Sequence, residues 1–385
     1  MRNNTKIKLA YIIPTLNYGG AERQLMELCA HLDSGLFEIV IILLRDEDKL
    51  FKHIYRAKIN TKIIKIKRNA RFDVRKILEL RRILNEEKPR IIHTFLPTAN
   101  FWGCLAARLS GRPQTIIASS RGMHYRFLDK WTLLNFISLN LLSDHLVVNS
   151  EAVKDNCTTL LRVKPDRITK INNGVIVGNG FIGPDKEYLR SQSTIADKGA
   201  PVIATIGRLD SLKGVDYLLE AAGILEERKI RANIVIAGEG PLRVRLEEKT
   251  KALGLTERVK FLGEIDNVAE LLSITDIFVL PTLSEGCSNV ILEAMSMGCA
   301  IVTTAIAANK ELLEDDESGL LVPSKDPKAL AEGLIKLMHD AQLRRRLGDR
   351  ARQRVKEGFS VDKMVREYEK FYCRLTGCYE SSSGN

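Results

Sequence analysis

The stretch from Phe278 to Val302, whose middle reads SEGCSNVILEAMSMGCAIV, limits what this chain can fold into more than any other part of it. Short apolar runs at 277–281 and 300–304 are typical of buried strands, and the residues from about Asn289 to Met297 have the pattern of a helix. A buried strand, a loop, a helix and a second strand form the repeating unit of a parallel α/β sheet. Ligands of such sheets bind at the carboxyl ends of the strands. The sequence therefore predicts an α/β fold with a site near the loop before Asn289.

Two acidic residues flank the start of this predicted helix. Glu285 lies in the loop, and Glu293 lies on the face of the helix that Asn289 also occupies. Backbone amides at the start of a helix lack partners within it and can hold a phosphate. The amides concerned are those near Cys287, Ser288, Asn289 and Val290. A nucleotide sugar fits this set, with one glutamate for the ribose and one for the sugar. The alternative, that both glutamates are solvated surface residues, stays open on spacing alone.

The composition is that of a globular enzyme. With 385 residues, and about 150 residues in an average domain, the chain has room for two or three domains. Hydrophobic residues make up 45% of it and charged residues 28%, which leaves ample material for a core. No apolar run reaches about 18 residues, so we expect no transmembrane helix, and the apolar run near the N-terminus is too short for a signal peptide. The seven cysteines are scattered without a CxxC pair, which suits the reducing cytosol.

Strand-like apolar runs alternate with helical stretches in the first half of the chain. The runs are KLAYIIP at 8–14, FEIVIILL at 37–44, PRIIHTF at 89–95, QTIIASS at 114–120 and DHLVVNS at 144–150. Gly19 and Gly20 follow the first run and let the backbone approach a ligand closely, although a plain turn is the commoner role of such a pair. The pair is not part of a GxGxxG motif, so we do not expect a nicotinamide cofactor.

Two basic residues follow the predicted strand at 114–120. Arg121 and His124 come just past its carboxyl end, where a binding site of an α/β sheet would lie. A surface position is the commoner fate of such residues, so both roles stay open. The next segment, 127–142, is apolar with few charges and is predicted to be a buried helix. A helix at a membrane interface is the alternative.

The region from 52 to 90 carries most of the net positive charge. It has fourteen basic residues against four acidic ones, so +10 of the formal net charge of +11 falls here. The basic residues are Lys52, Arg56, Lys58, Lys62, Lys65, Lys67, Arg68, Arg71, Arg75, Lys76, Arg81, Arg82, Lys88 and Arg90. Such a patch suits an anionic membrane surface, with a solvated basic face as the alternative. Interleaved aromatic residues and nucleic-acid-binding motifs are lacking, so we expect no nucleic-acid partner.

A second alternation of strands and helices begins at about residue 201, after a polar, glycine-containing stretch without periodicity. Arg208 ends its first predicted strand and Lys213 opens the next helix, so two cations are placed to clamp a diphosphate. The sequence thus predicts an N-terminal domain at 1–180, a linker at 181–200, a C-terminal domain at 201–357, a helix at 358–376 that returns to the first domain, and a disordered tail at 377–385.

The sequence resembles glycosyltransferase family 4, retaining enzymes of the GT-B fold. The matching stretches are GGAER, NNGV, IGRLDSLKGVDYLLEA, AGEGP, FLG, SEGCSNVILEAMSMGCAIV and SGLLVP, and they cover nearly the whole chain. The resemblance implies two Rossmann-like parallel-sheet domains that face each other across a cleft. It also implies that Arg208 and Lys213 bind the donor diphosphate. Glu293 would bind the ribose, and Glu285 would contact the transferred sugar.

The resemblance extends to further contacts and contains one departure. Additional donor contacts fall on Gly20, Gly286, Ser288, Asn289 and Val290. Many family members carry a histidine just after the fifth strand of the first domain, within a T-x-H stretch. This chain reads SSRGMHY there, so Arg121 or His124 stands near that place, and both are candidate catalytic residues.

The family is thought to react on one face of the sugar through an oxocarbenium-like state, without a protein nucleophile. In that mechanism Arg208, Lys213 and the helix start stabilise the leaving diphosphate, whose oxygen takes the proton of the acceptor. No metal and no cofactor are therefore expected. The acidic run Asp46-Glu47-Asp48 could hold a metal in another class of sugar transferase, but it precedes a predicted helix, whose dipole favours acids.

The function implied is transfer of a hexose or N-acetylhexosamine from a UDP- or GDP-sugar to a lipid-linked or cell-envelope polysaccharide acceptor, as in lipopolysaccharide synthesis. We expect a cytoplasmic protein that is peripheral on the inner face of the cell membrane. A nucleotide-sugar epimerase of the same fold is the first alternative. A basic membrane- or nucleic-acid-binding protein without catalysis is the second.

Overall fold

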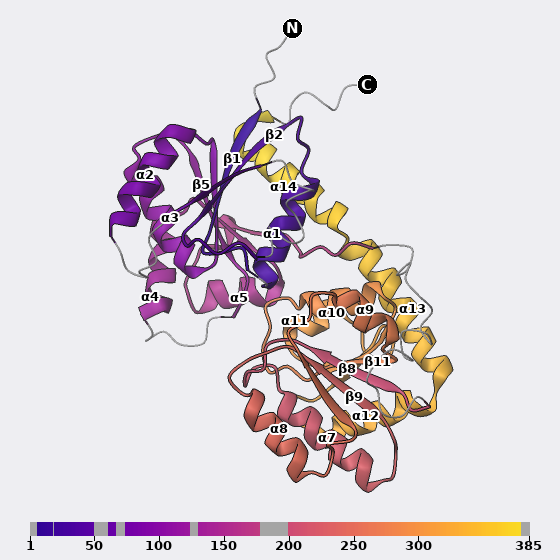
Figure 1. Cartoon of the computed structure of the whole chain (residues 1–385). Coiled ribbons are helices and arrows are strands. Elements are labelled where there is room, and N and C mark those ends of the chain that lie inside the picture. The colour runs from indigo at the N-terminus through magenta and orange to yellow at the C-terminus, as the bar shows by residue number, and fades with distance from the viewer. Residues whose placement is uncertain are drawn as a thin grey trace, which may run out of the picture. The chain divides into compact units, whose positions relative to one another are not determined.

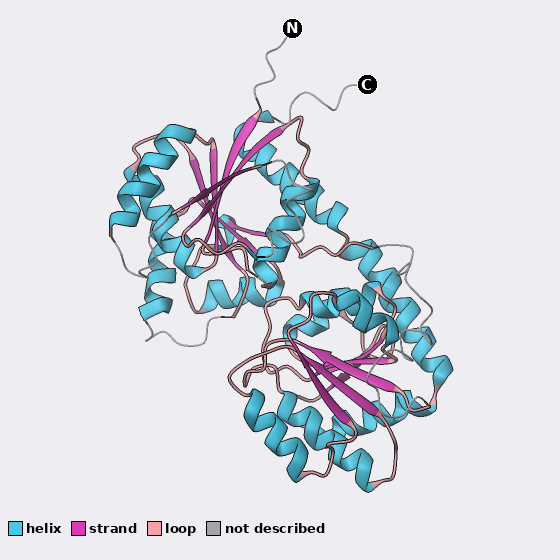
Figure 2. Cartoon of the chain, viewed as in Figure 1, coloured by secondary structure: helices cyan, strands magenta, loops and turns pink. Residues whose placement is uncertain are grey.

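The computed structural model describes residues 6–17, 19–49, 61–66, 74–123, 130–177 and 199–378. The chain divides into two compact units. Unit 1 comprises Met1–Gly174 and Val361–Asn385, and unit 2 comprises Val175–Ser360. Figure 1 follows the chain through both, and Figure 2 shows that each unit is a sheet with helices on both faces. Each unit is thus an α/β domain of the kind that the alternation of strands and helices predicts.

The described part of unit 1 holds a seven-stranded sheet in the order β3-β2-β1-β4-β5-β6-β7, in which every pairing is parallel. The strands are β1 (Ile7–Ile13), β2 (Phe37–Leu43), β3 (Lys62–Lys65), β4 (Ile91–Phe95), β5 (Thr115–Ser120), β6 (His145–Val148) and β7 (Ile168–Lys170). The inner strands are almost wholly buried because helices cover both faces, which explains their continuous apolar runs. Each of the five runs named from the sequence overlaps one of these strands.

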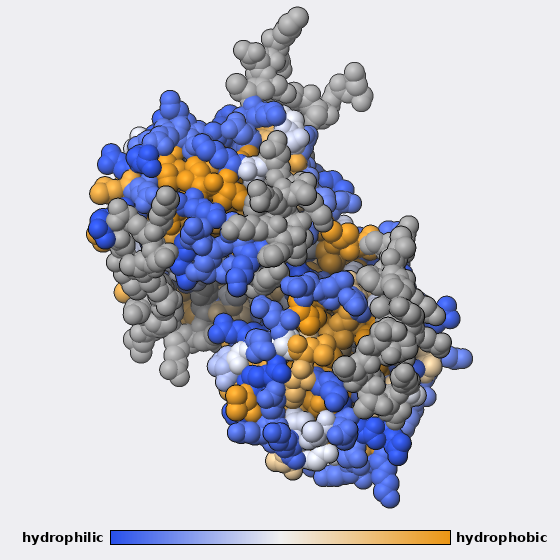
Figure 3. All heavy atoms as spheres, in the orientation of Figure 1, coloured by the Kyte–Doolittle hydropathy of each residue, from blue (hydrophilic) through white to orange (hydrophobic). Residues whose placement is uncertain are grey.

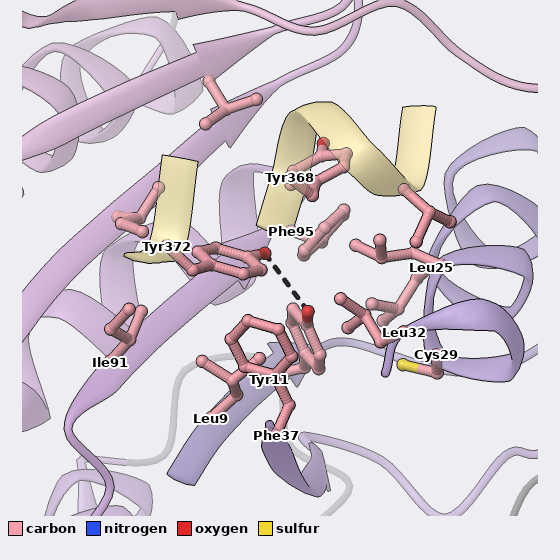
Figure 4. Packing of buried hydrophobic residues seen from close by; sticks show 14 of the residues in the cluster. Leu9, Tyr11, Leu25, Cys29, Leu32, Phe37, Ile91, Phe95, Tyr368 and Tyr372 are labelled. Carbon is pink, nitrogen blue, oxygen red and sulfur yellow. Dashed lines mark hydrogen bonds between the residues drawn. The ribbon is translucent and has the colours of Figure 1, made fainter. Parts of the chain in front are cut away.

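Helices on the two faces of this sheet form separate cores. The helices are α1 (Gly20–His31), α2 (Arg75–Glu87), α3 (Pro97–Leu109), α4 (Lys130–Ile137), α5 (Glu151–Thr159) and α14 (Val361–Thr376). One core includes Leu25 of α1 and Tyr368 of α14, and the other includes Leu80 of α2 and Trp102 of α3. Figure 4 shows Tyr368 and Tyr372 pointing in among side chains of β1, β2 and α1. The last helix of the chain is therefore part of the core of unit 1.

The apolar segment after β5 differs from its predicted role as a buried helix. Residues 127–129 lie outside the described residues, and the rest forms α4 and the π-helical turn η2 (Ser138–Leu142). Leu139 is fully buried, but Leu133 is 57% exposed and Leu141 is 68% exposed. The segment packs against α3. Because its apolar residues occur all around it, those that point away from α3 are left in solvent.

In the described residues of unit 2, six strands pair in parallel in the order β10-β9-β8-β11-β12-β13. They are β8 (Val202–Ile206), β9 (Asn233–Ala237), β10 (Val259–Gly263), β11 (Ile277–Leu280), β12 (Ala300–Thr304) and β13 (Leu320–Val322). The chain moves outward from β8 through β9 to β10, and then returns to place β11 on the other side of β8. The chain leaves β8 and β11 toward helices on opposite faces of the sheet, and such a switch point is the usual ligand site of an open α/β sheet.

Helices also cover both faces of this second sheet. They are α7 (Val215–Glu227), α8 (Arg243–Ala252), α9 (Val268–Ile274), α10 (Asn289–Ser296), α11 (Ala307–Leu312), α12 (Pro327–His339) and α13 (Ala341–Gly358). Helices α7, α8 and α12 pack in one core cluster, and α9, α10 and α13 pack in the other. The stretch from Phe278 to Val302 forms β11, α10 and β12, so the predicted strand–loop–helix–strand unit is confirmed.

The two units divide after Gly174 and again after Ser360. Residues 178–198, which include most of the predicted linker, lie outside the described residues, as do residues 379–385 of the predicted tail. Across the residues that the structure describes, no helix is long and apolar enough to cross a membrane.

Candidate functional site

Two loops of unit 2 meet at the carboxyl end of its sheet. The loop after β8 carries Arg208 and Lys213, and the loop after β11 carries Glu285. Nζ of Lys213 donates to Oε1 of Glu285 in an ion pair, although the two residues are 72 positions apart in the sequence. Their side chains are 24% and 13% exposed, so the pair is largely shielded from solvent. The fold thus brings together one predicted diphosphate-binding cation and the predicted sugar-binding carboxylate.

Hydrogen bonds hold these two loops together. The backbone N–H of Leu283 donates to the backbone oxygen of Leu212 at 2.7 Å, and the hydroxyl of Thr282 donates to the same oxygen at 2.9 Å. Thr282 is fully buried, and its Oγ1 also lies 3.4 Å from Oε1 of Glu285. The fold of both loops therefore sets the position of the ion pair.

Glycines allow the same loops to approach at backbone distance. Gly214 has a φ of +69°, and a Cβ there would lie 2.0 Å from the backbone oxygen of Pro281. Gly238, after β9, has a φ of +132°, and a Cβ there would lie 1.9 Å from the backbone oxygen of Gly207. Only glycine permits either approach. The backbones of the loops after β8, β9 and β11 thus pack closely against one another beside the site.

Arg208, the other predicted cation, is far more exposed to solvent than Lys213. Its side chain is 72% exposed, and its ion pair with Asp210 is long, at 3.8 Å from Nε to Oδ2. Oδ1 of Asp210 instead accepts from the backbone N–H groups of Leu212 at 3.0 Å and Lys213 at 3.3 Å. Exposed ion pairs of this kind contribute little. Arg208 therefore presents its charge to solvent, whereas Lys213 does not.

Helix α10 begins directly after the loop that carries Glu285. Ser288 caps it, because its Oγ accepts from the N–H of Ile291 at 3.5 Å. Asn289 and Glu293 lie one turn apart on the same face, and both are half-buried. The remaining predicted contacts of this segment are Gly286, which is buried, and Cys287 and Val290, which are half-buried. The start of a helix favours an anion, so the predicted diphosphate contacts of this segment lie where the backbone carries positive potential.

In unit 1, Arg121 follows β5 as predicted, but its guanidinium is bonded within the protein. Nη1 donates to Oδ1 of Asn173 at 2.8 Å, and Nη2 donates to the hydroxyl of Tyr368 at 2.7 Å. Its Cζ lies 4.8 Å from the centre of the Phe95 ring, a cation–π distance. Arg121 therefore ties the end of β5 to α14. His124 lies outside the described residues.

A buried histidine lies beside this contact. Nδ1 of His93 lies 2.8 Å from the hydroxyl of Tyr372, and Nε2 lies 2.7 Å from Oγ of Ser119. The hydroxyl of Tyr11 donates to that of Tyr372 at 3.1 Å, as Figure 4 shows. Burial, and to a lesser extent the charge of Arg121, lowers the pKa of His93 well below its ordinary value. The imidazole is therefore neutral at pH 7 and belongs to a packed polar network.

Gly20, the predicted donor contact of unit 1, is the exposed first residue of α1. Gly19 before it is the N-cap of that helix. A Cβ on Gly19 would lie 2.2 Å from Oε2 of Glu22, and burial raises the pKa of the Glu22 carboxyl. The carboxylate is the end of a flexible side chain and could move aside, so this contact does not by itself require glycine at position 19.

The acidic run after β2 forms ion pairs within unit 1. Nζ of Lys65 lies 2.7 Å from Oδ1 of Asp46 and 2.8 Å from Oδ2 of Asp48. Over the described ranges, no group of three or more His, Cys, Asp or Glu side chains is arranged to hold a metal ion.

Sequence reasoning missed two residues that organise the site. Asp210 bonds the backbone of the Lys213 loop, and Thr282 joins that loop to the one after β11. Each is a polar residue that follows a buried strand by a few positions, so the sequence could have indicated both as candidates. It could not have shown that Thr282 contacts a second loop, because its partner Leu212 is 70 positions away.

Known proteins match both units. The model of Glycosyltransferase Family 4 matches residues 18–178, and the model of Glycosyl transferases group 1 matches residues 185–354. An alpha-1,4-N-acetyl-D-galactosaminyltransferase of Campylobacter jejuni, named for a PP-undecaprenol substrate, is 29% identical over 96% of this chain and 99% of that protein. An Escherichia coli alpha-1,3-galactosyltransferase, named for UDP-Gal and a GlcNAc-diphosphoundecaprenol, is 27% identical over 78% of this chain and 79% of that protein.

A solved structure extends the likeness over both units. Anabaena Alr3699/HepE in complex with UDP has a TM-score of 0.83 at 18% identity, and the match covers 96% of this chain and 100% of that one. At this identity the likeness concerns the fold. The two relatives named above are transferases, which gives the epimerase alternative no support.

Proposed function

Because this chain belongs to glycosyltransferase family 4 and the group 1 glycosyl transferases and has the GT-B fold, we propose that it is a retaining glycosyltransferase. It moves a sugar from a UDP-sugar to a lipid-linked or cell-envelope polysaccharide acceptor. The observation that carries the proposal is the pairing of Lys213 with Glu285 directly before the start of α10. A nucleotide sugar needs a cation and a helix start for its diphosphate, and a carboxylate for its sugar hydroxyls.

The donor and acceptor classes rest on the relatives. The Anabaena structure holds UDP and the E. coli relative is named for UDP-Gal, which favours UDP over GDP. The sugar is a hexose or N-acetylhexosamine, the classes that the two relatives are named for. Both relatives are also named for diphosphoundecaprenol-type substrates, which favours a lipid-linked acceptor in the synthesis of a surface polysaccharide.

In the proposed mechanism, the protein stabilises the leaving group. Arg208, Lys213 and the start of α10 place fixed positive potential around the diphosphate as its bond to the sugar breaks, and such preorganised charge often contributes most to the rate enhancement of an enzyme. Glu293 holds the ribose hydroxyls, and Glu285 faces the sugar as positive charge develops on it. The departing phosphate oxygen takes the proton of the acceptor on the same face of the sugar, so the configuration is retained without a protein base or a metal.

We propose that the enzyme adsorbs to the cytoplasmic face of the membrane through the basic region 52–90. In the described part of this region, Lys62 and Lys65 form ion pairs within unit 1. They therefore contribute less to membrane binding than two unpaired lysines would. On α2, Arg75, Arg81 and Arg82 are exposed, and Val74 and Leu78 beside them are 68% and 65% exposed. Arg82 also pairs with Glu86 at 2.9 Å, but an exposed pair of this kind is weak. Figure 3 shows orange hydrophobic residues within the blue surface near α2. Basic and apolar side chains on one helix suit an anionic bilayer.

Replacing Arg75, Arg81 and Arg82 by Gln together should release the protein from anionic liposomes, since each basic residue near the surface contributes about 1 kcal/mol. Activity on a water-soluble acceptor should be unchanged. The matched control replaces three exposed arginines of α13 in unit 2, Arg345, Arg346 and Arg350, and should leave liposome binding intact. Equal binding of the parent protein to neutral and anionic liposomes would contradict the membrane proposal.

A panel of UDP- and GDP-sugars tests the proposed reaction. At least one UDP-sugar should raise the unfolding temperature and undergo slow hydrolysis, and the first-formed sugar should keep its anomeric configuration by NMR. Incubation with donor alone should yield no sugar isomer. An absence of stabilisation and hydrolysis across the panel would refute the proposed function, and inversion at the anomeric carbon would refute the retaining mechanism.

A further inference from the structure

The ion pair between Lys213 and Glu285 poses a problem for donor binding. The same ammonium that is assigned to the diphosphate already donates to a carboxylate of the protein. We propose that Glu285 is an internal competitor of the diphosphate, so that nucleotide and carboxylate occupy Lys213 in turn. This inference rests on the proposed function, because it assumes that a nucleoside diphosphate binds at this end of the sheet.

The pair is built into the two loops. Lys213 is 24% exposed and Glu285 is 13% exposed. The stem of Lys213 lies along the backbone of Gly207, since a Cβ there would be 3.6 Å from Cε. The hydroxyl of Thr282, bonded to the Lys213 loop at 2.9 Å, lies 3.4 Å from the Glu285 carboxylate. Two loops fixed in this way hold the charges together before any ligand arrives, which reduces the entropy cost of pairing.

The two cations of the site therefore serve different stages of binding. Arg208 is 72% exposed, with its partner Asp210 at 3.8 Å, so it can meet an incoming diphosphate without giving up a strong contact. Lys213 must exchange Glu285 for a phosphate oxygen. That exchange sets the Glu285 carboxylate free to turn toward the sugar hydroxyls, so binding of the diphosphate prepares the residue that faces the sugar.

The competition also separates donor from product. When the intact nucleotide sugar is bound, Glu285 gains hydroxyl partners that offset its loss of Lys213. When the nucleoside diphosphate alone is bound, no sugar offers those partners, and re-formation of the ion pair favours release of the nucleotide. The ion pair therefore weakens product binding more than donor binding, and it speeds clearance of the site after each transfer.

Calorimetric titration with UDP, and separately with GDP, tests this on four proteins: the parent, Glu285→Gln, Lys213→Gln and the double variant. Glu285→Gln leaves Lys213 without its carboxylate and should bind UDP at least about fivefold more tightly, the ratio at the upper end of what exposed ion pairs contribute, because this pair is largely shielded. In the Lys213→Gln background the same change should leave the UDP affinity unaltered. Turnover should fall in every variant.

Glu220→Gln is the matched control. Glu220 pairs with Lys249 at 2.6 Å in the same unit, away from the loops after β8 and β11, so its loss should leave the UDP affinity at the parent value. Thermal unfolding of each variant verifies that it is folded.

Two outcomes overturn the proposal. If the parent binds UDP and Glu285→Gln binds it equally or more weakly, Glu285 does not compete. If Glu285→Gln tightens binding as much without Lys213 as with it, the carboxylate repels the nucleotide through space and the exchange is refuted. Failure of the parent to bind either UDP or GDP would instead refute the proposed function itself, and this inference with it.

Discussion

The carboxyl ends of the two sheets carry polar residues in opposite states. In unit 1, Arg121 follows β5 and His93 lies in the middle of β4, and both are bonded to tyrosines of α14. In unit 2, Arg208 lies in solvent and Lys213 is paired with a glutamate of a neighbouring loop. The polar groups of unit 1 are thus held by the last helix of the chain, whereas the charges of unit 2 lie on loops.

This difference shows that a polar residue after a strand indicates a ligand site only when no other helix or strand of the protein is hydrogen-bonded to it. The position of Arg121 and that of Arg208 look alike in sequence. What separates them is Tyr368, which lies 247 residues after Arg121 and whose hydroxyl accepts a hydrogen bond from it where α14 packs against the sheet. The two units can therefore be compared by experiment, since unit 1 should respond to substitution in stability and unit 2 in catalysis.

The largest effect is expected in unit 2. Arg208→Ala and Lys213→Ala should each cost about 2–4 kcal/mol of transition-state stabilisation, by analogy with the loss of other charge-stabilising donors, and the loss appears in kcat/KM for the nucleotide sugar. The unfolding temperature should change little in Arg208→Ala, because that side chain is 72% exposed. Lys213→Ala leaves the shielded Glu285 carboxylate without its partner, so this variant should also lose some stability. Unchanged turnover in either variant would remove that residue from the site.

Arg121→Met is the corresponding change in unit 1. It deprives Asn173 and Tyr368 of their donor and should lower the free energy of unfolding of unit 1 by about 1–3 kcal/mol, the usual cost of an unsatisfied buried partner. Thermal unfolding measures it, and turnover well below the transition should be nearly unchanged. Arg208→Met is the matched control, with the opposite pattern. A collapse of turnover at unaltered stability would break the comparison and return Arg121 to the catalytic residues.

The pH dependence of stability gives a smaller effect in unit 1. Burial lowers the pKa of His93 in the folded state well below its ordinary value of 6.5. The unfolded chain therefore binds the extra proton first, so the contribution of His93 is fully present above about pH 6.5. Below that pH, stability should fall by about 1.4 kcal/mol for each pH unit until the folded pKa is reached.

Unfolding temperatures at pH 7.5 and 5.5, for the parent and for His93→Gln, check this. The variant should lose less stability on acidification. His145, whose pKa burial also lowers, contributes with the same sign in both proteins and cancels in the difference. Parallel curves for parent and variant would show that the pKa of His93 is not lowered by folding, against the buried network described above.

The fold could be predicted from the sequence because the patterns that indicate strands and helices are local. Continuous apolar runs bounded by loop residues mark strands that are buried on both faces, and the unit from β11 to β12 was predicted to within a residue or two. The exposure of Leu133 and Leu141 could not be predicted, because the sequence of an apolar helix does not show how much of its surface the neighbouring helices will bury. Here α3 covers one side of it.

The site was predictable only one residue at a time. Arg208, Lys213, Glu285 and Glu293 could each be placed at the end of a strand or on a helix, which is a local property. The ion pair of Lys213 with Glu285 is a property of two loops, and no spacing in the sequence predicts it. The pairs of His93 with Tyr372 and of Arg121 with Tyr368 likewise depend on where the final helix docks.

The smallest effect is expected at Thr282, where the site of unit 2 resembles the packed network of unit 1. Thr282→Val keeps the shape of the side chain and removes the hydroxyl that bonds the Leu212 oxygen and lies 3.4 Å from Glu285. The oxygen keeps its second donor, the N–H of Leu283 at 2.7 Å, so stability should fall by at most about 1 kcal/mol. Without the hydroxyl the Glu285 loop is held less firmly against the Lys213 loop, and kcat should fall about fivefold while KM for the nucleotide sugar stays near the parent value. Thr282→Ser keeps the hydroxyl and should restore most of kcat. Steady-state kinetics on the two variants decides the matter, since a serine variant as slow as the valine one would show that Thr282 fills space and positions nothing.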